Sequence, residues 1–322
     1  MTVDKVLEAG ADLDREIRLP RMQQGPQPQH LLITLLGDYW YARTEHLPSA
    51  ALVALLGEFG ISQVAARAAL SRLARRGLLE VSKQGRRTYY ALTGRATRVL
   101  SGGVQRIMSF GMTARPWDGS WRIAIFSVPE EQRDLRHSAR ARLRWLGFAP
   151  LYDGVWISPN DVAADAAAAL AGLGVRSYSV MAAQAPVGVP QGQDPLDAWD
   201  LAELRDGYER FVSEREDLLR RARDGAVSTS EALLARTDVM DTWRQFPNLD
   251  PELPAELLPE DWPLQRAHDM FARLYDNLGP LAEIRVRQIV TRFSDELGAL
   301  VRHHTTGSVL DRARLPIATD SV

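Results

Sequence analysis

Residues 49–92 constrain the fold of this chain more than any other stretch. Two short amphipathic segments are separated by Gly60, and the second begins at Ser62, a typical helix N-cap, and ends before Gly77, which suits a C-cap. Two strand-like runs follow, on either side of a turn signal at Gln84-Gly85. Helix, tight glycine turn, helix and hairpin, in this order, predict a winged helix-turn-helix.

The second helix of this stretch has an apolar face and a basic face. At about 100° per residue, we expect one face to pack on the core through Ala66, Ala69, Leu70 and Leu73. Arginine on the opposite face suits bidentate hydrogen bonding to guanine in a major groove, and arginine at the flanks suits phosphate contact. The residues predicted to contact DNA are Ser62, Gln63, Arg67, Ser71, Arg72, Arg75 and Arg76 of the helix and Lys83, Arg86 and Arg87 of the hairpin tip. The alternative interpretation is an ordinary solvated basic face.

Charge is distributed unevenly along the chain. The formal net charge of the whole chain is −2, which by itself argues against a nucleic-acid-binding protein. Residues 28–110 nevertheless hold eleven Lys and Arg against four Asp and Glu, a net of +7, so the remainder carries −9. A basic head on an acidic body is typical of a DNA-binding domain joined to a sensing or assembly domain.

Composition narrows the class of protein. The absence of cysteine excludes disulfides, thiolate metal sites and cysteine nucleophiles. No apolar run reaches the roughly 20 residues that span a bilayer, and charged residues interrupt the N-terminus where a signal-peptide core would lie. We therefore expect a cytoplasmic protein without a membrane partner. No HExxH, P-loop or nucleotide-binding glycine motif is present, and we expect no catalytic site, no metal site and no cofactor.

The rest of the chain predicts two further domains. Residues 120–182 follow the order strand, helix, two strands joined at Asp153-Gly154, helix and strand, which is the βαββαβ order of a ferredoxin-like domain. Residues 195–304 have helical patterns throughout. The predicted fold class is α+β with several domains: a flexible extension at 1–27, the winged domain with a connector helix at 28–110, the ferredoxin-like domain at 120–182, the helical domain at 195–304 and a flexible tail at 305–322.

Glycine and proline set several expected helix boundaries. Gly102-Gly103 is expected to interrupt the connector helix, and one uninterrupted helix is expected over residues 200–223. Two separate helices are expected over residues 264–278 and 281–300. A short helix near residues 3–17 is also expected within the N-terminal extension.

Three strings of residues carry more specific information. Residues 67–73 read Arg-Ala-Ala-Leu-Ser-Arg-Leu and precede Arg-Gly-Leu-Leu, and the middle region contains Leu-Gly-Phe and Val-Trp-Ile-Ser. Residues 250–263 contain Asp-Pro-Glu-Leu-Pro, Leu-Leu-Pro and Asp-Trp-Pro, the most specific of the three strings. Together they resemble the PaaX family of bacterial repressors over residues 29–300. Leu264 departs from the resemblance, because a glycine is expected after Asp-Trp-Pro.

The resemblance implies a homodimeric regulator of aromatic catabolism, phenylacetate above all, that leaves its operator DNA on binding an aryl-acyl coenzyme A. Such an inducer needs an apolar slot for its acyl group and cations for its phosphates. The C-terminal region offers both residue types, and the effector candidates are Trp243, Arg244, Trp262 and Arg266. Core packing is the alternative interpretation of both tryptophans.

The middle region also resembles the CRISPR spacer-acquisition proteins of ferredoxin-like fold, some of which are metal-dependent nucleases. Those nucleases hold a metal with an aspartate at the end of the first strand. Here that place reads Phe126-Ser127-Val128-Pro129, without a carboxylate. A nucleic-acid-processing enzyme therefore remains the alternative to a ligand-responsive repressor, and Ser127 favours the repressor.

Overall fold

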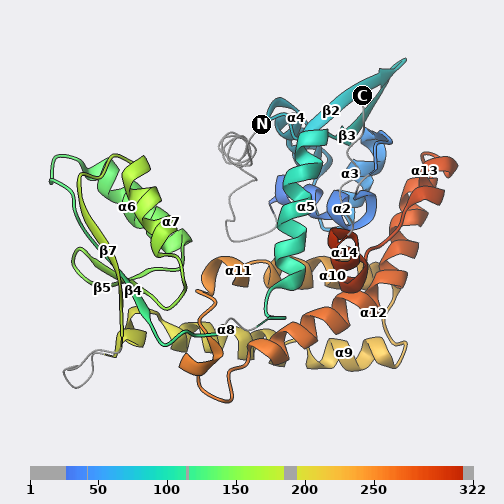
Figure 1. Cartoon of the computed structure of the whole chain (residues 1–322). Helices are drawn as coiled ribbons and strands as arrows, with labels where there is room; N and C mark the ends of the chain where they lie inside the picture. Colours follow the sequence, from blue (N-terminus) through green and yellow to red (C-terminus); the bar gives the residue numbers. More distant parts are fainter. Residues whose placement is uncertain (1–26, 42, 114–115, 185–193, 315–322) are drawn as a thin grey trace. The chain divides into compact units, whose positions relative to one another are not determined.

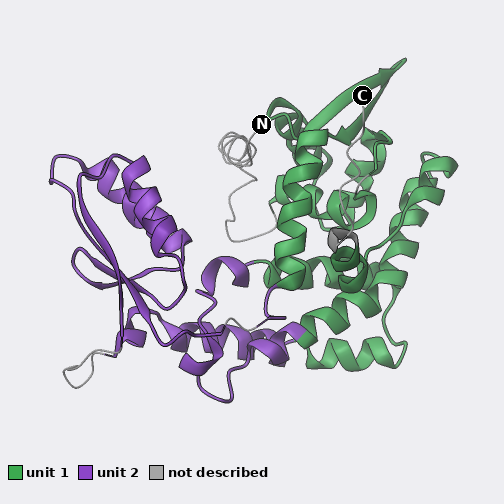
Figure 2. Ribbon diagram, viewed as in Figure 1, with its two compact units in different colours: residues 1–109, 215–244, 269–322 green, residues 110–214, 245–268 purple. Residues whose placement is uncertain are grey.

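The structure is a computed structural model of the whole chain, and it describes residues 27–41, 43–113, 116–184 and 194–314. These residues form a mixed α+β structure with two small sheets and a helical C-terminal region, which confirms the predicted α+β class. They divide into two compact units, shown in Figure 2. Unit 1 comprises Met1–Ser109, Arg215–Arg244 and Asp269–Val322, and unit 2 comprises Phe110–Glu214 and Gln245–His268. The helix expected near residues 3–17 lies outside the described residues.

Unit 1 begins with three helices and a small antiparallel sheet (Figure 1). The helices are α2 (Pro28–Trp40), α3 (Ser49–Glu58) and α4 (Gln63–Arg75). The strands are β1 (Leu47–Pro48), β2 (Leu79–Gln84) and β3 (Arg87–Leu92), in the order β1-β3-β2. The hairpin β2–β3 projects from the helices of this unit in Figure 1.

Local sequence explains how α4 and the hairpin form. The hydroxyl of Ser62 accepts a hydrogen bond from the backbone N–H of Ala65 at 3.3 Å, so the helix has the predicted N-cap. The predicted apolar face is confirmed, because the buried residues of α4 are Ala66, Ala69, Leu70 and Leu73. Gly77 ends the helix with φ 68°, and Gly85 occupies the hairpin turn with φ 59°, a backbone conformation that favours glycine.

Helix α5 (Gly94–Ser109) runs without interruption through Gly102 and Gly103, so the expected break is wrong. Each glycine lowers helix propensity by roughly 1 kcal/mol relative to alanine but does not forbid the conformation. The helix keeps its buried residues Ala96, Leu100 and Met108 on both sides of the pair. Burial of this apolar side outweighs the weak local preference.

The C-terminal helices of unit 1 differ from the expected pattern at Pro280. The helix α12 (Leu264–Thr291) continues for 28 residues through this proline, where two helices were expected, and α13 (Asp295–Leu300) follows separately. Pro280 has no N–H for the carbonyl four residues earlier. Leu278, Ala282 and Val286 nevertheless remain fully buried on both sides of it. Burial of this apolar side holds the helix together across the missing hydrogen bond.

Two further expectations are wrong. Residues 200–223 form two helices, α8 (Leu201–Ser213) in unit 2 and α9 (Glu216–Arg223) in unit 1. The side chain of Arg215, between them, is buried and bonds to Asp238 at 2.8 Å and to Thr242 at 3.0 Å. Within the stretch expected to be a flexible tail, Thr306–Arg314 form helix α14, whose first N–H bonds to the Asp276 carboxylate at 2.8 Å.

A buried polar cluster joins the N-terminal and C-terminal segments of unit 1. Arg236 of α10 (Thr229–Trp243) is fully buried and lies 3.3 Å from the Asp38 carboxylate of α2. The Tyr275 hydroxyl of α12 donates to the same carboxylate at 2.7 Å. Arg236 also donates to the carbonyls of Tyr275 and His304, at 3.0 and 2.6 Å. Burial raises the pKa of Asp38, and the positive charge of Arg236 opposes that shift.

Unit 2 contains a four-stranded antiparallel sheet of order β5-β6-β4-β7, and its elements follow the expected βαββαβ order. The strands are β4 (Trp121–Ser127), β5 (Ala149–Tyr152), β6 (Val155–Ser158) and β7 (Ser177–Ala183). The helices α6 (Arg133–Trp145) and α7 (Ala163–Gly172) cover one face, where Phe126 and Trp156 of the sheet share a core with Leu143 and Leu170.

The remainder of unit 2 consists of α8, the start of α12 and three short elements. The elements are η1 (Pro195–Ala198), α11 (Phe246–Leu249) and η2 (Ala255–Leu257). The ring of Tyr208 stacks on Phe246 with centroids 4.4 Å apart, and its hydroxyl donates to Asp250 at 2.6 Å. Among all helices of the described residues, none has the length and apolarity needed to cross a membrane.

We predict that Arg236→Ala lowers the free energy of unfolding by about 3–5 kcal/mol, because it leaves the Asp38 carboxylate buried without its cation. Denaturant titration followed by circular dichroism measures this loss. Arg273→Ala is the matched control: Arg273 is exposed on α12, and we expect its removal to change stability by less than about 0.5 kcal/mol. Equal, small effects of the two substitutions would contradict the role given to the buried cluster.

Candidate nucleic-acid interface

The outward face of α4 is polar, basic and exposed. Gln63, Arg67, Ser71 and Arg75 lie on this face, and the neighbouring Ser62, Arg72 and Arg76 are exposed as well. Arg67 donates to Gln63 across one helical turn at a long 3.5 Å. This contact is weak, so the guanidinium of Arg67 keeps most of its hydrogen-bonding capacity for a ligand.

Val64 belongs to the same surface and was missed by the sequence analysis. It lies in the first turn of α4, and 78% of it is exposed, the largest value among the exposed large apolar residues of the described chain. An apolar side chain at this place on a groove-reading helix would suit the methyl group of thymine. Its position in the sequence could have indicated this exposure, because Val64 falls outside the apolar face of the helix.

The structure brings the basic residues of α4 and of the hairpin together. Arg67 of α4 and Arg86 and Arg87 of the hairpin line one cavity of about 640 Å³. In the part of the chain that the structure describes, the side chains of Arg86 and Arg87 make no hydrogen bond or ion pair. Lys83 is exposed on β2 and is not part of the cavity lining. Three guanidinium groups around one cavity form a binding surface for anions.

Two of the four effector candidates lie in unit 1 and have structural partners. Trp243 is fully buried, stacks on Phe271 with centroids 4.9 Å apart and donates its indole N–H to the carbonyl of Ile107 at 3.1 Å. Arg244 bonds to Asp241 at 2.7 Å and to Thr34 at 2.8 Å. Burial lowers the pKa of Arg244. Both residues therefore serve the packing of unit 1.

The other two candidates lie in unit 2, beside a cavity of about 530 Å³. Trp262 lines this cavity, and its indole N–H is buried without a hydrogen-bond partner among the described residues. Glu252, on the same lining, is the one non-glycine residue with positive φ in the described chain, at 53°. Arg266 is exposed and is not part of the lining. An unpaired buried donor and a strained backbone in one cavity are features of a ligand site.

Leu264, where a glycine was expected, also lines this cavity. A Cβ atom at Gly111, which has φ 81°, would lie 3.1 Å from the Leu264 side chain. Leu264 and Gly111 therefore lie close together in the lining of this cavity.

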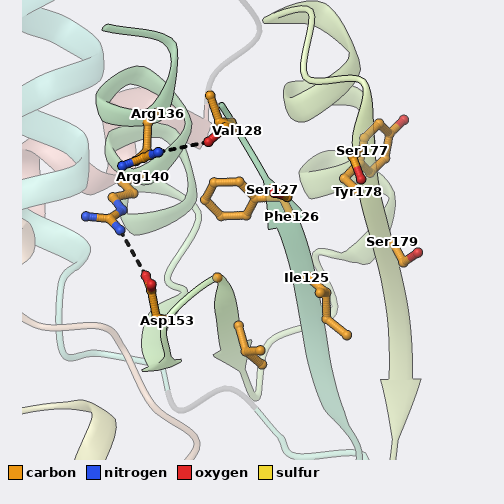
Figure 3. Close-up of a pocket in the computed structure, with 12 residues that line it drawn as sticks. Ile125, Phe126, Ser127, Val128, Arg136, Arg140, Asp153, Ser177, Tyr178 and Ser179 are labelled. Carbon is orange, nitrogen blue, oxygen red and sulfur yellow. Dashed lines mark hydrogen bonds and ion pairs between the residues drawn. The ribbon is translucent and has the colours of Figure 1, made fainter. Parts of the chain in front are cut away.

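A third cavity, of about 490 Å³, lies beside the end of strand β4 in unit 2 (Figure 3). Ser127 lines it, at the place where a nuclease of this kind would carry a metal-binding aspartate. Its two arginines have partners: Arg136 donates to the carbonyl of Val128 at 2.9 Å, and Arg140 pairs with Asp153 at 3.3 Å. Within the described residues, no three His, Asp or Glu side chains come together as metal ligands.

Three family models match consecutive parts of the chain. The model described as PaaX-like protein matches residues 27–96, the PaaX protein central Cas2-like domain matches 114–195, and the PaaX-like protein C-terminal domain matches 199–288. The chain belongs to the PaaX family. The resemblance found in the sequence is thereby confirmed.

Two individual proteins are similar to this member of the PaaX family. The transcriptional repressor PaaX of Escherichia coli (strain K12) is 28% identical over 259 residues, which cover 78% of this chain and 80% of that protein. The solved structure of the uncharacterized protein Rv0674 from Mycobacterium tuberculosis has a TM-score of 0.50 and 23% identity, covering 79% of this chain and 98% of that chain. The second likeness concerns the fold alone.

The family matches divide the candidate residues among three regions. All ten candidates of α4 and the hairpin fall in the N-terminal PaaX-like match, and Ser127 falls in the Cas2-like match. The cavity beside Trp262 is lined mainly by residues of the C-terminal PaaX-like match. The basic surface and the cavity beside Trp262 thus belong to separate parts of a PaaX-family chain.

Proposed function

We propose that this chain is a transcriptional repressor that binds operator DNA through α4 and the hairpin β2–β3. The observation that carries the proposal is the exposed basic face of α4, with Arg67 sharing a cavity with the hairpin arginines Arg86 and Arg87. The similarity to a transcriptional repressor of Escherichia coli supports it. In this proposal α4 enters the major groove, Arg67 and Arg75 contact bases, and the hairpin arginines contact the DNA backbone.

The proposed domains follow from the same elements. Residues 28–110 form a winged helix-turn-helix with its connector helix α5, and residues 120–182 form a ferredoxin-like domain. The strand order β5-β6-β4-β7 and the two helices on one face support the second assignment. Residues 195–304 form the helical domain, with 1–27 and 305–322 as terminal segments. As a regulator of a bacterial chromosome, the protein would act in the cytoplasm, without a membrane partner.

We propose no enzymatic activity for the middle region. A metal-dependent nuclease would need carboxylates near the end of β4, and Ser127 stands there, with the paired Arg136 and Arg140 beside it. Incubation of the purified protein with labelled DNA, with and without Mg²⁺ or Mn²⁺, tests the proposed absence of nuclease activity. Metal-dependent cleavage that persists in a repurified sample would contradict it.

We predict that Arg67→Ala weakens binding to the operator by about 1–3 kcal/mol and reduces the preference over unrelated DNA, because it removes a base contact. Arg86→Ala should weaken binding to both DNAs by similar factors, because it removes a phosphate contact. The operator is first selected from genomic fragments with the purified protein, and affinities are measured by fluorescence anisotropy. Wild-type affinity and preference in Arg67→Ala would show that another face of the helix reads the bases.

We predict a homodimer on an inverted or nearly inverted repeat, because one winged domain covers a short site and two-fold symmetry doubles it. Light scattering of the free protein and of its operator complex should give the mass of two chains per assembly. The two half-sites should be centred about one helical turn, or a multiple of it, apart. A single chain both free and on DNA is the contrary result.

We propose that an acyl coenzyme A, of the phenylacetyl type, is the inducer and that its acyl group enters the cavity beside Trp262. The buried and unpaired indole N–H of Trp262 gives the thioester or amide oxygens of such a ligand a donor. The exposed Arg266 suits a phosphate. Trp243 and Arg244 are weaker candidates because packing and ion pairing already engage them.

We predict that phenylacetyl coenzyme A releases the protein from its operator, whereas free phenylacetate and coenzyme A alone do not. If the inducer binds the protein state that does not bind DNA more tightly than the DNA-binding state by about 3 kcal/mol, operator affinity falls roughly a hundredfold. Trp262→Phe keeps an aromatic ring but removes the N–H, and it should reduce the response while DNA affinity stays at the wild-type value. Release by the free acid alone would overturn the ligand class, and a full response in Trp262→Phe would remove the ligand from this cavity.

A further inference from the structure

The cavity that contains Arg67, Arg86 and Arg87 has a fourth arginine from a distant part of the sequence. Arg292 and Phe293 follow the last residue of α12 and line the same cavity of about 640 Å³. Among the described residues, none of those that line it is Asp or Glu. Four arginines, from α4, the hairpin and the end of α12, therefore line one space to which the described residues bring no carboxylate.

Within the described residues, none of these four arginines forms an ion pair. Arg67 and Arg292 contact only neutral oxygens, those of the Gln63 side chain at 3.5 Å and the Gln288 carbonyl at 3.4 Å. The side chains of the hairpin arginines have no hydrogen-bond or ion-pair partner within the described residues. Arginine remains charged at any physiological pH, so the four cations repel one another until an anion enters.

The carboxylate of Glu58, whose pKa the hydrogen bonds from Arg285 and the charge of Arg292 lower, is already paired with Arg285. Glu58 of α3 accepts two hydrogen bonds from Arg285, both at 2.9 Å, and one from Ser230 at 3.2 Å. The hydrogen bonds from Arg285 hold the pKa of Glu58 below its usual range, and the charge of Arg292 lowers it further. Glu58 thus remains an anion paired with Arg285 and gives Arg292 only a distant, partial compensation.

The same ion pair lies near the end of α12 that precedes Arg292. Arg285 is seven residues before Arg292, and Arg292 itself follows the last residue of the helix. The bidentate pair of Arg285 with Glu58 holds this part of α12 against α3. Backbone hydrogen bonds from Phe293 and Ser294 to the carbonyl of Val290 form the turn that carries Arg292 beyond the helix end.

We propose that Arg292 binds a backbone phosphate of DNA, at a site that it shares with Arg67, Arg86 and Arg87. The proposal rests on the proposed DNA-binding function and extends the interface to the C-terminal helices of unit 1. A phosphodiester brings the negative charge that the cavity wall lacks, and guanidinium groups match its oxygens in a bidentate geometry. The contact is independent of sequence, because phosphates are the same at every base pair.

The experiment compares the salt dependence of DNA binding in Arg292→Ala, Arg86→Ala and wild type, on operator and on unrelated duplex. Loss of one phosphate contact should reduce the slope of log K against log salt concentration by about 0.9. Arg292→Ala should show this reduction and should weaken both duplexes by the same factor. Arg292→Lys should keep the wild-type slope because it keeps the charge. Arg273→Ala, which removes an unpaired arginine of α12 outside the cavity, should match wild type.

The outcomes separate this proposal from the proposed function. A wild-type slope in Arg292→Ala, together with a reduced slope in Arg86→Ala, would overturn the role of Arg292 and leave DNA binding through the hairpin intact. Wild-type protein that binds no DNA would overturn both. Thermal melting by circular dichroism accompanies each variant, and Arg292→Lys shows whether charge or fold is responsible if Arg292→Ala melts early.

The phosphates of a free ligand are the other source of the same chemistry. Coenzyme A alone is therefore added as a competitor of duplex DNA for wild type and for Arg292→Ala. We expect no displacement from either protein at concentrations that saturate the response to phenylacetyl coenzyme A. Displacement of DNA from the wild-type protein by coenzyme A, if it is lost in Arg292→Ala, would assign the arginine site to a nucleotide phosphate. That result would overturn the DNA assignment.

Discussion

The fold of unit 1 depends on the contact between Arg236 and Asp38. A buried arginine without a partner would be strongly destabilising, so α10 can occupy its place only when α2 presents the carboxylate and α12 presents Tyr275. The segment that bears the proposed recognition helix is thereby joined to helices two hundred residues later in the chain. In agreement with this contact, the N-terminal region shares one compact unit with Arg215–Arg244 and Asp269–Val322.

Much of the N-terminal region could be predicted because its signals are local. Ser62, the four buried residues of α4 and the hairpin at Gly85 are each determined by neighbours within a few positions. The expected breaks at Gly102-Gly103 and Pro280 failed for a common reason. A local preference of roughly 1–3 kcal/mol is weaker than the burial of an apolar helix face over several turns, and burial depends on partners that the local sequence does not reveal.

The candidate sites also differ in whether the local sequence reveals them. The basic face of α4 is visible in its spacing, whereas Arg292 reaches the hairpin cavity only through the tertiary packing of α12 on α3. Trp243 and Trp262 look alike in sequence, as tryptophans close to an arginine, yet one is fully buried with its N–H bonded and the other lines a cavity with its N–H unpaired. Only the surroundings of each indole distinguish a core residue from a candidate ligand contact.

The outward side chains of α4 make few contacts with the rest of the protein, which affects how such proteins diverge. Gln63, Arg67, Ser71 and Arg75 project into solvent, and the hydrogen bond between the first two is long. Substitutions on this face therefore alter few contacts that hold the protein together, and exposed positions of this kind usually change stability by less than about 0.5 kcal/mol. In the proposed mode of DNA binding, duplicated genes could acquire new operator sequences by exchanging these residues, one at a time, on an unchanged scaffold. The same freedom would make the face a practical target for redirecting the protein to a chosen promoter.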